Sequence, residues 1–320
     1  MFEAKPAPRP PFTLIRGGEV YSPVPIGRQE ILCAGDRILT IGQDLEPAAA
    51  ALGAVEVIDA TGLSVVPGFI DQHLHFIGGG DFEGPLGRVP ELHLSWIVSG
   101  GVTTAVGIMG IDMEYKNLHG LLVKARELER SGLSTYIYTG SFALPSPVLT
   151  TSVRADITLI DKVIGAKVAI SENVYPNLDF SLLAELGAQL RFARNLTGKA
   201  AVMHCHVGRN PKRLQPLFDL LDAIELPIDQ ILPTHLNRRE PDGLAHAIEF
   251  ARRGGTIDFS CNMSRRSGSV TAVNPDEAVR HVLQAGIALD RITLSSDANV
   301  SMPVLAEDGR IISLHNAPPT

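Results

Sequence analysis

Short apolar runs alternate with helical patterns through most of this sequence, and the alternation is what most restricts its fold. A parallel strand needs a long crossover connection to reach its neighbour, and an α-helix usually makes that connection. Eight apolar runs occupy residues 63–75, 102–107, 134–139, 166–171, 200–206, 230–235, 256–260 and 291–297. Seven helical patterns lie between them, at residues 90–99, 118–131, 153–163, 178–195, 211–223, 242–253 and 275–285. The repeat predicts an α/β fold, a (β/α)8 TIM barrel.

Two of the expected helices carry start signals: Asn210 precedes Pro211, and Asn274 precedes Pro275. After the last apolar run, residues 301–320 contain a turn signal at 307–309 but no helical pattern. We therefore expect a barrel that lacks a clear eighth helix, with a C-terminus that looks truncated.

The residues before the barrel predict a smaller unit. Residues 1–11 are proline-rich and are expected to form a disordered lead. Short strand patterns separated by turn residues then follow, at residues 12–16, 19–21, 29–33, 37–41 and 55–58. The expected organisation is a small β-sandwich-like domain over residues 12–62 and the barrel over residues 63–320.

Composition excludes several classes of protein. Apolar residues make up 45% of the 320 residues and charged residues 20%, enough for a large core. The net charge of −7 and the absence of a basic stripe argue against a nucleic-acid partner. With no apolar run of 18 residues and no signal-peptide pattern, we expect a cytoplasmic protein without a membrane partner. The three cysteines, Cys33, Cys205 and Cys261, fit neither a disulfide framework nor a Cys-x-x-Cys site.

Metal-ligand residue types end several of the apolar runs. His73 and His75 lie two apart on one expected strand, so both imidazoles face the same side, as two ligands of one metal ion would. Taken alone, the pair could equally be solvated or structural. However, other runs end in His204, His206, His235 and Asp297. The carboxyl ends of barrel strands form the active-site rim, so the sequence predicts a metal site there.

Lys167 lies inside an apolar run, where a charged ammonium is costly to bury. Burial lowers the pKa of a lysine, and a neutral amine can add carbon dioxide to give a carbamate that bridges two cations. The alternative is a lysine that reaches the rim or pairs with an acid. Asp297 could take a proton from a bridging water and pass it to a leaving group, or could instead cap a following helix.

Several of these segments resemble a known family. Residues 66–75 with Lys167, His206, His235 and Asp297 resemble the amidohydrolase superfamily, over nearly the whole chain. Residues 163–171, 232–238 and 295–299 further resemble its isoaspartyl dipeptidase family. The spacing cannot choose between His204 and His206, and the family motif selects His206.

The resemblance implies a binuclear metal hydrolase that cleaves isoaspartyl (β-aspartyl) dipeptides, with a metal-bound hydroxide attacking the amide. It implies one zinc ion on His73, His75 and Asp297, a second on His206 and His235, and N6-carboxylated Lys167 bridging both. Asp297 would be the catalytic proton carrier, and Arg238 and Ser301 would bind the substrate carboxylate. A homo-oligomer with a small peptide or amide substrate is also implied. The same ligand types suit cobalt, manganese or iron.

Three positions depart from the family pattern. The glutamate that binds the substrate amino group aligns with Phe82, although a shift of one residue would bring Glu83 there. A tyrosine that polarises the scissile carbonyl aligns with Phe142, and a loop arginine aligns with Val174. These changes favour one alternative, a related amidohydrolase for a different amide or cyclic amide. The truncated-looking end of the chain favours another, a non-catalytic truncated homologue.

Overall fold

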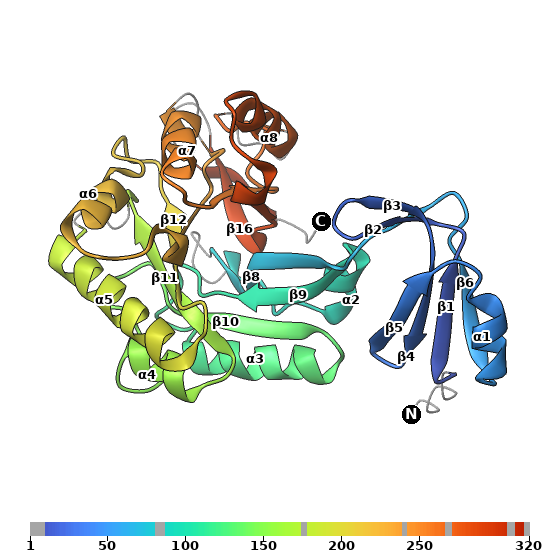
Figure 1. The fold of residues 1–320 in the computed structure, drawn as a ribbon. Coiled ribbons are helices and arrows are strands. Elements are labelled where there is room, and N and C mark those ends of the chain that lie inside the picture. The colour runs from blue at the N-terminus through green and yellow to red at the C-terminus, as the bar shows by residue number, and fades with distance from the viewer. Residues whose placement is uncertain are drawn as a thin grey trace. The chain divides into compact units, whose positions relative to one another are not determined.

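The structure is a computed structural model that describes residues 10–80, 87–173, 178–238, 242–265, 271–305 and 311–316 (Figure 1). The chain divides into two compact units, residues 1–68 and residues 69–320. Of the lead expected at residues 1–11, only residues 10 and 11 lie within the described part.

The first unit contains two small sheets. In the four-stranded sheet the order is β5 (Arg37–Gly42), β4 (Glu30–Ala34), β1 (Phe12–Arg16) and β6 (Val55–Asp59). In the three-stranded sheet the order is β3 (Pro25–Arg28), β2 (Glu19–Tyr21) and β7 (Ser64–Val65). This agrees with the short strands expected from the sequence, to which the structure adds β3 and β7.

Helix α1 (Glu46–Ala51) corrects the expectation of an all-β unit. Its alanine-rich sequence favours a helix, and Ala49 packs against Leu14 of β1 and Leu32 of β4. Six residues are too few to show a helical period. The apolar run at residues 63–75 is also two strands and not one, because Pro67 and Gly68 interrupt it between β7 and β8.

The second unit is the expected barrel. Six parallel strands stand side by side in chain order: β8 (Phe69–Gly79), β9 (Val102–Gly107), β10 (Ser134–Gly140), β11 (Val163–Ile170), β12 (Val202–Val207) and β13 (Ile231–Thr234). Strands β14 (Ile257–Ser260) and β15 (Ile292–Ser295) form a separate parallel pair. Seven of these strands begin and end within three residues of the predicted runs, whereas β8 begins later than its run and extends past His75 to Gly79.

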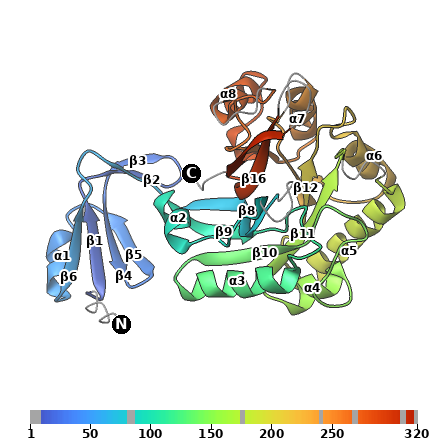
Figure 2. The same ribbon diagram turned by 180° about the vertical axis from the view of Figure 1, so that it is seen from behind.

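Helices connect these strands and line the outer side of the sheet, as Figures 1 and 2 show for α3, α4 and α5. They are α2 (Leu94–Ser99), α3 (Leu118–Arg130), α4 (Val153–Leu159), α5 (Phe180–Thr197), α6 (Gln215–Ala223), α7 (Asp242–Arg252) and α8 (Pro275–Gln284). Asn274 is the N-cap of α8, as predicted. Asn210 does not start α6, which begins at Gln215 after Arg213 has adopted a left-handed conformation (φ 48°).

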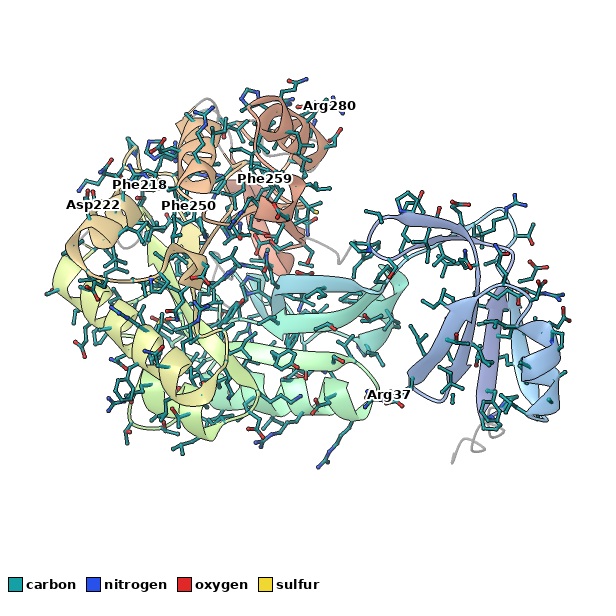
Figure 3. The ribbon with its side chains drawn as sticks, in the orientation of Figure 1. Arg37, Phe218, Asp222, Phe250, Phe259 and Arg280 are labelled. Carbon is teal, nitrogen blue, oxygen red and sulfur yellow. The ribbon has the colours of Figure 1, made fainter. Side chains whose placement is uncertain are left out.

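The core lies between the barrel strands and the surrounding helices. Helix α3 contributes a buried face of Leu121, Ala125 and Leu128, which recur at helical spacing. Phe218 of α6, Phe250 of α7 and Phe259 of β14, labelled in Figure 3, fill the space around the last strands. The core therefore fixes the strand ends on which the candidate site stands.

The buried carboxylate of Asp258 joins the β14–β15 pair to the rest of the barrel. One oxygen accepts hydrogen bonds from Gln72 of β8 (2.8 Å) and Thr293 of β15 (2.9 Å). The other accepts from Thr234 of β13 and Ser295 of β15, both at 2.6 Å. Burial raises the pKa of Asp258 to about 6, although these hydrogen bonds oppose the rise.

After β15 the described residues form two strands and no helix. Strand β16 (Ala298–Leu305) runs parallel to β8 and antiparallel to β17 (Ile311–Asn316). The expected absence of an eighth helix therefore agrees with the described part of this segment. The turn predicted at residues 307–309 lies outside the described residues.

Candidate active site

Three predicted ligands meet at the carboxyl end of the barrel strands. His73 and His75 project from β8, and Asp297 lies two residues after the end of β15. The Nε2 atoms of His73 and His75 lie 3.2 Å and 3.3 Å from the same atom, Asp297 Oδ1. One ligand atom from each residue lies within 4.8 Å of the others, and all three side chains are buried. This spacing suits a common cation.

The backbone explains how Asp297 reaches the histidines. Its N–H donates to the carbonyl of His73 at 3.0 Å, and it adopts a left-handed conformation with φ 52°. The preceding Ser296 is held by the buried carboxylate of Asp71, which accepts hydrogen bonds from its N–H (3.2 Å) and its hydroxyl. Asp71 also accepts from the N–H of His73 at 3.1 Å. A left-handed non-glycine residue is strained, and these bonds hold it in place.

His235 approaches from the end of β13, also in a left-handed conformation (φ 65°). Its Nδ1 lies 2.6 Å from the hydroxyl of Ser260 and 3.9 Å from Asp297 Oδ2. The His206 ring, from β12, lies 4.5 Å from the His235 ring. The structure thus places His206 and His235 together, next to the group formed by His73, His75 and Asp297.

Lys167 lies on β11 and is 1% exposed. Its Nζ donates to the carbonyl of Met109 at 2.7 Å and lies 4.9 Å from the centre of the Phe142 ring. Burial lowers the pKa of Lys167 to about 7, while the charges of Asp297 and Asp112 work in the opposite direction. A substantial fraction of this amine is therefore neutral near pH 7.

Three consecutive glycines, Gly78, Gly79 and Gly80, follow His75 and shape the rim of the candidate site. A Cβ at Gly79 would meet Nδ1 of His75 at 2.4 Å, and one at Gly80 would meet the carbonyl oxygen of Ser301 at 2.4 Å. Strand β8 ends within this cluster, at Gly79. The cluster leaves room for His75 and for Ser301, whose buried hydroxyl has no hydrogen-bond partner among the described residues.

Glu172 is a site residue that the sequence reasoning missed. It follows the end of β11, and its Oε2 lies 3.1 Å from Nε2 of His206 and 3.6 Å from Arg238. Arg238 also approaches Nε2 of His206, at 3.0 Å. Burial alone would raise the pKa of Glu172, but His206 and Arg238 bring it to about 2. The sequence did contain a signal for it, since Glu172 is an acidic residue just past the end of a predicted strand.

His204 lies in the barrel interior. Its Nε2 is 2.6 Å from Nδ1 of His73, and its ring stacks on Tyr138 with centroids 4.8 Å apart. It is 0% exposed, whereas His206 faces Glu172 and Arg238 at the rim. The two histidines share a strand face but occupy different depths of the barrel.

The site histidines are neutral. Burial lowers the pKa of His73 to about 3 and that of His206 to about 4, and it lowers the pKa of His75 and His235 as well. Burial works to raise the pKa of Asp297, but the neighbouring His235 and His73 hold it well below its usual value. The site therefore offers neutral imidazole lone pairs and an anionic carboxylate, which is the protonation state that metal ligands need.

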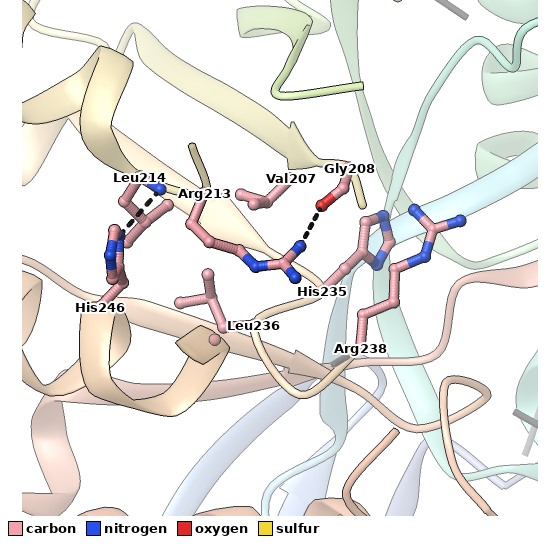
Figure 4. Close-up of a pocket in the computed structure, with 9 residues that line it drawn as sticks. Val207, Gly208, Arg213, Leu214, His235, Leu236, Arg238 and His246 are labelled. Atoms are coloured by element: carbon pink, nitrogen blue, oxygen red, sulfur yellow. Dashed lines mark hydrogen bonds between the residues drawn. The ribbon is translucent and has the colours of Figure 1, made fainter. Parts of the chain in front are cut away.

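His235 and Arg238 help to line a small cavity of about 10 Å³, with room for about one water molecule. Its lining residues are drawn in Figure 4. Arg213 spans it and donates to the carbonyl of Gly208 at 3.1 Å, while Nδ1 of His246 accepts from the N–H of Leu214 at 3.2 Å. These contacts tie the segment after β12 to itself and to α7.

Among the predicted substrate residues, Arg238 lies beside His206, and the backbone of Ser301 lies against Gly80, just past the end of β8. Phe82, Glu83 and Val174 lie outside the described residues. Phe142 follows β10 and is buried, with its ring 4.5 Å from the His206 ring. It therefore lies directly against the site, with a phenyl edge and no hydroxyl.

The residues present fit a divalent cation. Buried imidazole nitrogens of His73 (Nε2) and His235 (Nε2) have no hydrogen-bond partner among the described residues, although such atoms are usually satisfied. Both belong to rings whose Nδ1 atom is already held, by His204 and by Ser260. A metal ion is the partner that this arrangement of nitrogen and carboxylate donors suits.

No protein-family model matches the chain. Its structure is similar to that of β-aspartyl dipeptidase from Fervidobacterium islandicum, solved in complex with β-Asp-Leu dipeptide: the TM-score is 0.85 and the identity 33%, over 96% of this chain and 78% of that one. D-Hydantoinase (dihydropyrimidinase) from Thermus sp. matches with TM-score 0.65 and 18% identity over 96% of this chain and 74% of that one, which shows a shared fold. A curated dihydroorotase from Lactobacillus johnsonii is 38% identical over 64 residues, 20% of this chain and 13% of that protein's length.

The barrel, the site and these similarities define a hydrolase of the amidohydrolase superfamily. Within that superfamily the chain belongs to the β-aspartyl dipeptidase family. In the part of the chain that the structure describes, no helix is long and apolar enough to cross a membrane.

Proposed function

We propose that this chain is a metal-dependent hydrolase of β-aspartyl dipeptides, which splits the amide between an aspartate side-chain carboxyl and the next residue. The observation that carries the proposal is the buried group of His73, His75 and Asp297 at the barrel rim. The solved relative with β-Asp-Leu bound, which is 33% identical, supports the choice of substrate.

In this proposal His73, His75 and Asp297 hold one divalent ion, and His206 and His235 hold a second. The amine of Lys167, whose pKa of about 7 leaves it partly neutral, would add carbon dioxide and lose one proton to give a carbamate, a further anionic ligand for the ions. Imidazole and carboxylate donors suit zinc. When bound, the ions supply a water of lowered pKa as nucleophile and polarise the amide carbonyl.

The chain's own residues bind the substrate and move the proton. Oδ1 of Asp297 faces His73 and His75, and its Oδ2 takes the proton of the attacking water and passes it to the leaving amine nitrogen. Arg238 and the Ser301 hydroxyl bind the α-carboxylate of the leaving residue, and a guanidinium fork matches a carboxylate well. Glu83 is the proposed partner of the substrate α-amino group.

The direct test is hydrolysis of β-aspartyl-leucine by the zinc-loaded protein in bicarbonate buffer, with α-aspartyl-leucine as the control. Cleavage of the β isomer alone would support the proposal. A folded protein that holds two metal ions and leaves both isomers intact would contradict the substrate. A protein with neither bound metal nor activity would instead match a non-catalytic homologue.

A second candidate is an amidohydrolase acting on a different amide or a cyclic amide. Phe142 favours it, because a phenyl ring stands where the family places a tyrosine hydroxyl that stabilises the developing oxyanion. Losing such a donor costs on the order of 10²- to 10³-fold in rate. Assays with N-acyl amino acids and five- and six-membered cyclic imides, beside β-aspartyl-leucine, separate the two candidates by their relative kcat/KM.

A further inference from the structure

The two histidines of β8 are held very differently, although both point at Asp297. Behind His75, Nδ1 faces the backbone of Gly79 and has no hydrogen-bond partner among the described residues. Behind His73, Nδ1 lies 2.6 Å from Nε2 of His204. A second imidazole therefore stands behind one member of the pair only.

We propose that His204 is a positioning residue: it accepts a hydrogen bond from the Nδ1–H of His73 and so presents Nε2 of His73 to the divalent ion. The inference rests on the proposed metal-dependent function. His204 itself is 0% exposed and lies one layer deeper in the barrel, so it touches neither the proposed ion nor the substrate.

The direction of the hydrogen bond follows from the surroundings of His73. Its Nε2 faces Oδ1 of Asp297 at 3.2 Å, on the side shared with His75 and His235. A ligating imidazole nitrogen carries no proton, so the proton of neutral His73 belongs on Nδ1. A buried N–H needs an acceptor, and Nε2 of His204 is the atom within reach. His204 then carries its own proton on Nδ1, an atom without a hydrogen-bond partner among the described residues.

The backbone and the neighbouring ring fix His204 in the orientation that this role requires. Strand β12 pairs with β11 so that His204 stands beside Lys167, which places it in the barrel interior. Tyr138 of β10 stacks on its ring at an interplanar angle of 22°. The N–H and carbonyl of His73 are also engaged, by Asp71 and by Asp297. The ring torsion is then the remaining freedom of His73, and His204 removes it.

A partner that fixes the tautomer of a metal-binding histidine typically contributes 10- to 100-fold in metal affinity. A residue that only fills space behind His73 would not contribute to metal affinity in this way. His204→Gln and His204→Met, which introduce side chains of similar volume, distinguish a positioning role from a space-filling one. The amide oxygen of glutamine can accept the hydrogen bond from His73, whereas the thioether of methionine accepts poorly. The matched control is Cys205→Ala, on the same strand with its side chain in the outer core.

The experiment measures zinc affinity by chelator competition for the parent, His204→Met, His204→Gln and Cys205→Ala, together with thermal unfolding. We expect His204→Met to bind zinc about 10- to 100-fold more weakly, while His204→Gln and Cys205→Ala stay near the parent. Equal affinity in a folded His204→Met protein would overturn the inference, as would equal losses in the Met and Gln variants. A parent without zinc affinity would overturn the proposed function as well.

A spectroscopic measurement on the parent keeps the inference testable even if His204→Met fails to fold. In the zinc-loaded protein with ¹⁵N-labelled histidine, His73 should show a proton on Nδ1 that exchanges slowly with solvent and couples to Nε2 of His204. A proton on Nε2 of His73, with Nδ1 on the metal, would be incompatible with the role assigned to His204.

Discussion

His73 and Asp297 are joined twice, although His73 lies on β8 and Asp297 follows β15: Asp297 donates its N–H to the carbonyl of His73 at 3.0 Å, and its Oδ1 lies 3.2 Å from Nε2 of the same histidine. The first contact joins the backbone of β8 to the segment after β15, and the second places a carboxylate against an imidazole. Closure of the fold and assembly of the candidate site therefore depend on the same pair.

Replacing Asp297 should test the proton transfer. We expect Asp297→Asn to lower kcat for β-aspartyl-leucine by about 10²- to 10⁴-fold, the usual contribution of general acid–base catalysis. The amide keeps the size of the side chain but does not take up the proton. Steady-state kinetics measure the loss, and Asp290→Asn, at an exposed position, is the matched control. A kcat close to that of the parent would show that another group moves the proton.

Removing Lys167 should remove metal and activity together. We expect Lys167→Ala to weaken zinc binding by more than about 100-fold. This exceeds the loss caused by replacing a residue that contacts only a metal ligand. Propionate or another short carboxylic acid, with bicarbonate present, should restore part of the activity by replacing the carbamate. Metal analysis and rate measurements with and without the acid check both points. Lys212→Ala, an exposed lysine, should behave as the parent, and full activity in Lys167→Ala would show the bridge assignment to be wrong.

Restoring a hydroxyl beside His206 should improve β-aspartyl cleavage if that is the reaction. We expect Phe142→Tyr to raise kcat by up to about 10²-fold, because an added donor stabilises the developing oxyanion. The exposed substitution Phe192→Tyr serves as the control. A fall in kcat for β-aspartyl-leucine, together with an unchanged rate on another amide, would favour the second candidate function.

Arg238 should determine how tightly the leaving residue is bound. Arg238→Lys keeps the charge but loses the planar fork, so KM for β-aspartyl-leucine should rise about tenfold, from the loss of a charge-assisted hydrogen bond. The control is a change of substrate: β-aspartyl-leucinamide has no terminal carboxylate, and its KM should be the same for both proteins. An equal rise for both substrates would show that Arg238 acts through His206 and not through the carboxylate.

Asp258 should make stability depend on pH. Burial raises its pKa from 3.8 to about 6, so the folded protein binds this proton more tightly than the unfolded chain. Its contribution to stability is complete below pH 4 and is lost as the pH rises through 6. The shift corresponds to about 3 kcal/mol. The free energy of unfolding of the metal-free parent, relative to that of Asp258→Asn, should fall by roughly this amount between pH 4 and 7.

Urea unfolding at several pH values in the presence of a chelator measures this difference. Asp290→Asn, on the surface, controls for the change of charge. A constant difference between parent and Asp258→Asn across this range would mean that Asp258 keeps an ordinary pKa in the folded protein.

The sequence by itself determined the barrel, since the strands and helices are local and repeat at their own periods. All eight predicted runs became strands, and residues such as Asn274 began helices where expected. It missed α1 because six residues are too short to show a period. The two-residue period of a strand also predicted that His73, His75 and Lys167 point into the barrel, because alternate residues of a strand share a face.

The tertiary structure decided what depends on contacts between distant strands. Sequence spacing could not choose between His204 and His206, since both face inward. The contacts of the His204 ring with His73 of β8 and Tyr138 of β10 showed that His204 lies deep, behind His73. Glu172 lies outside the predicted runs, and Asp258 and Ser260 lie inside one. The roles of all three arise from partners on or beside other strands. A period along the chain predicts which way a side chain points, whereas its depth and its partner are set by how separate strands are brought together.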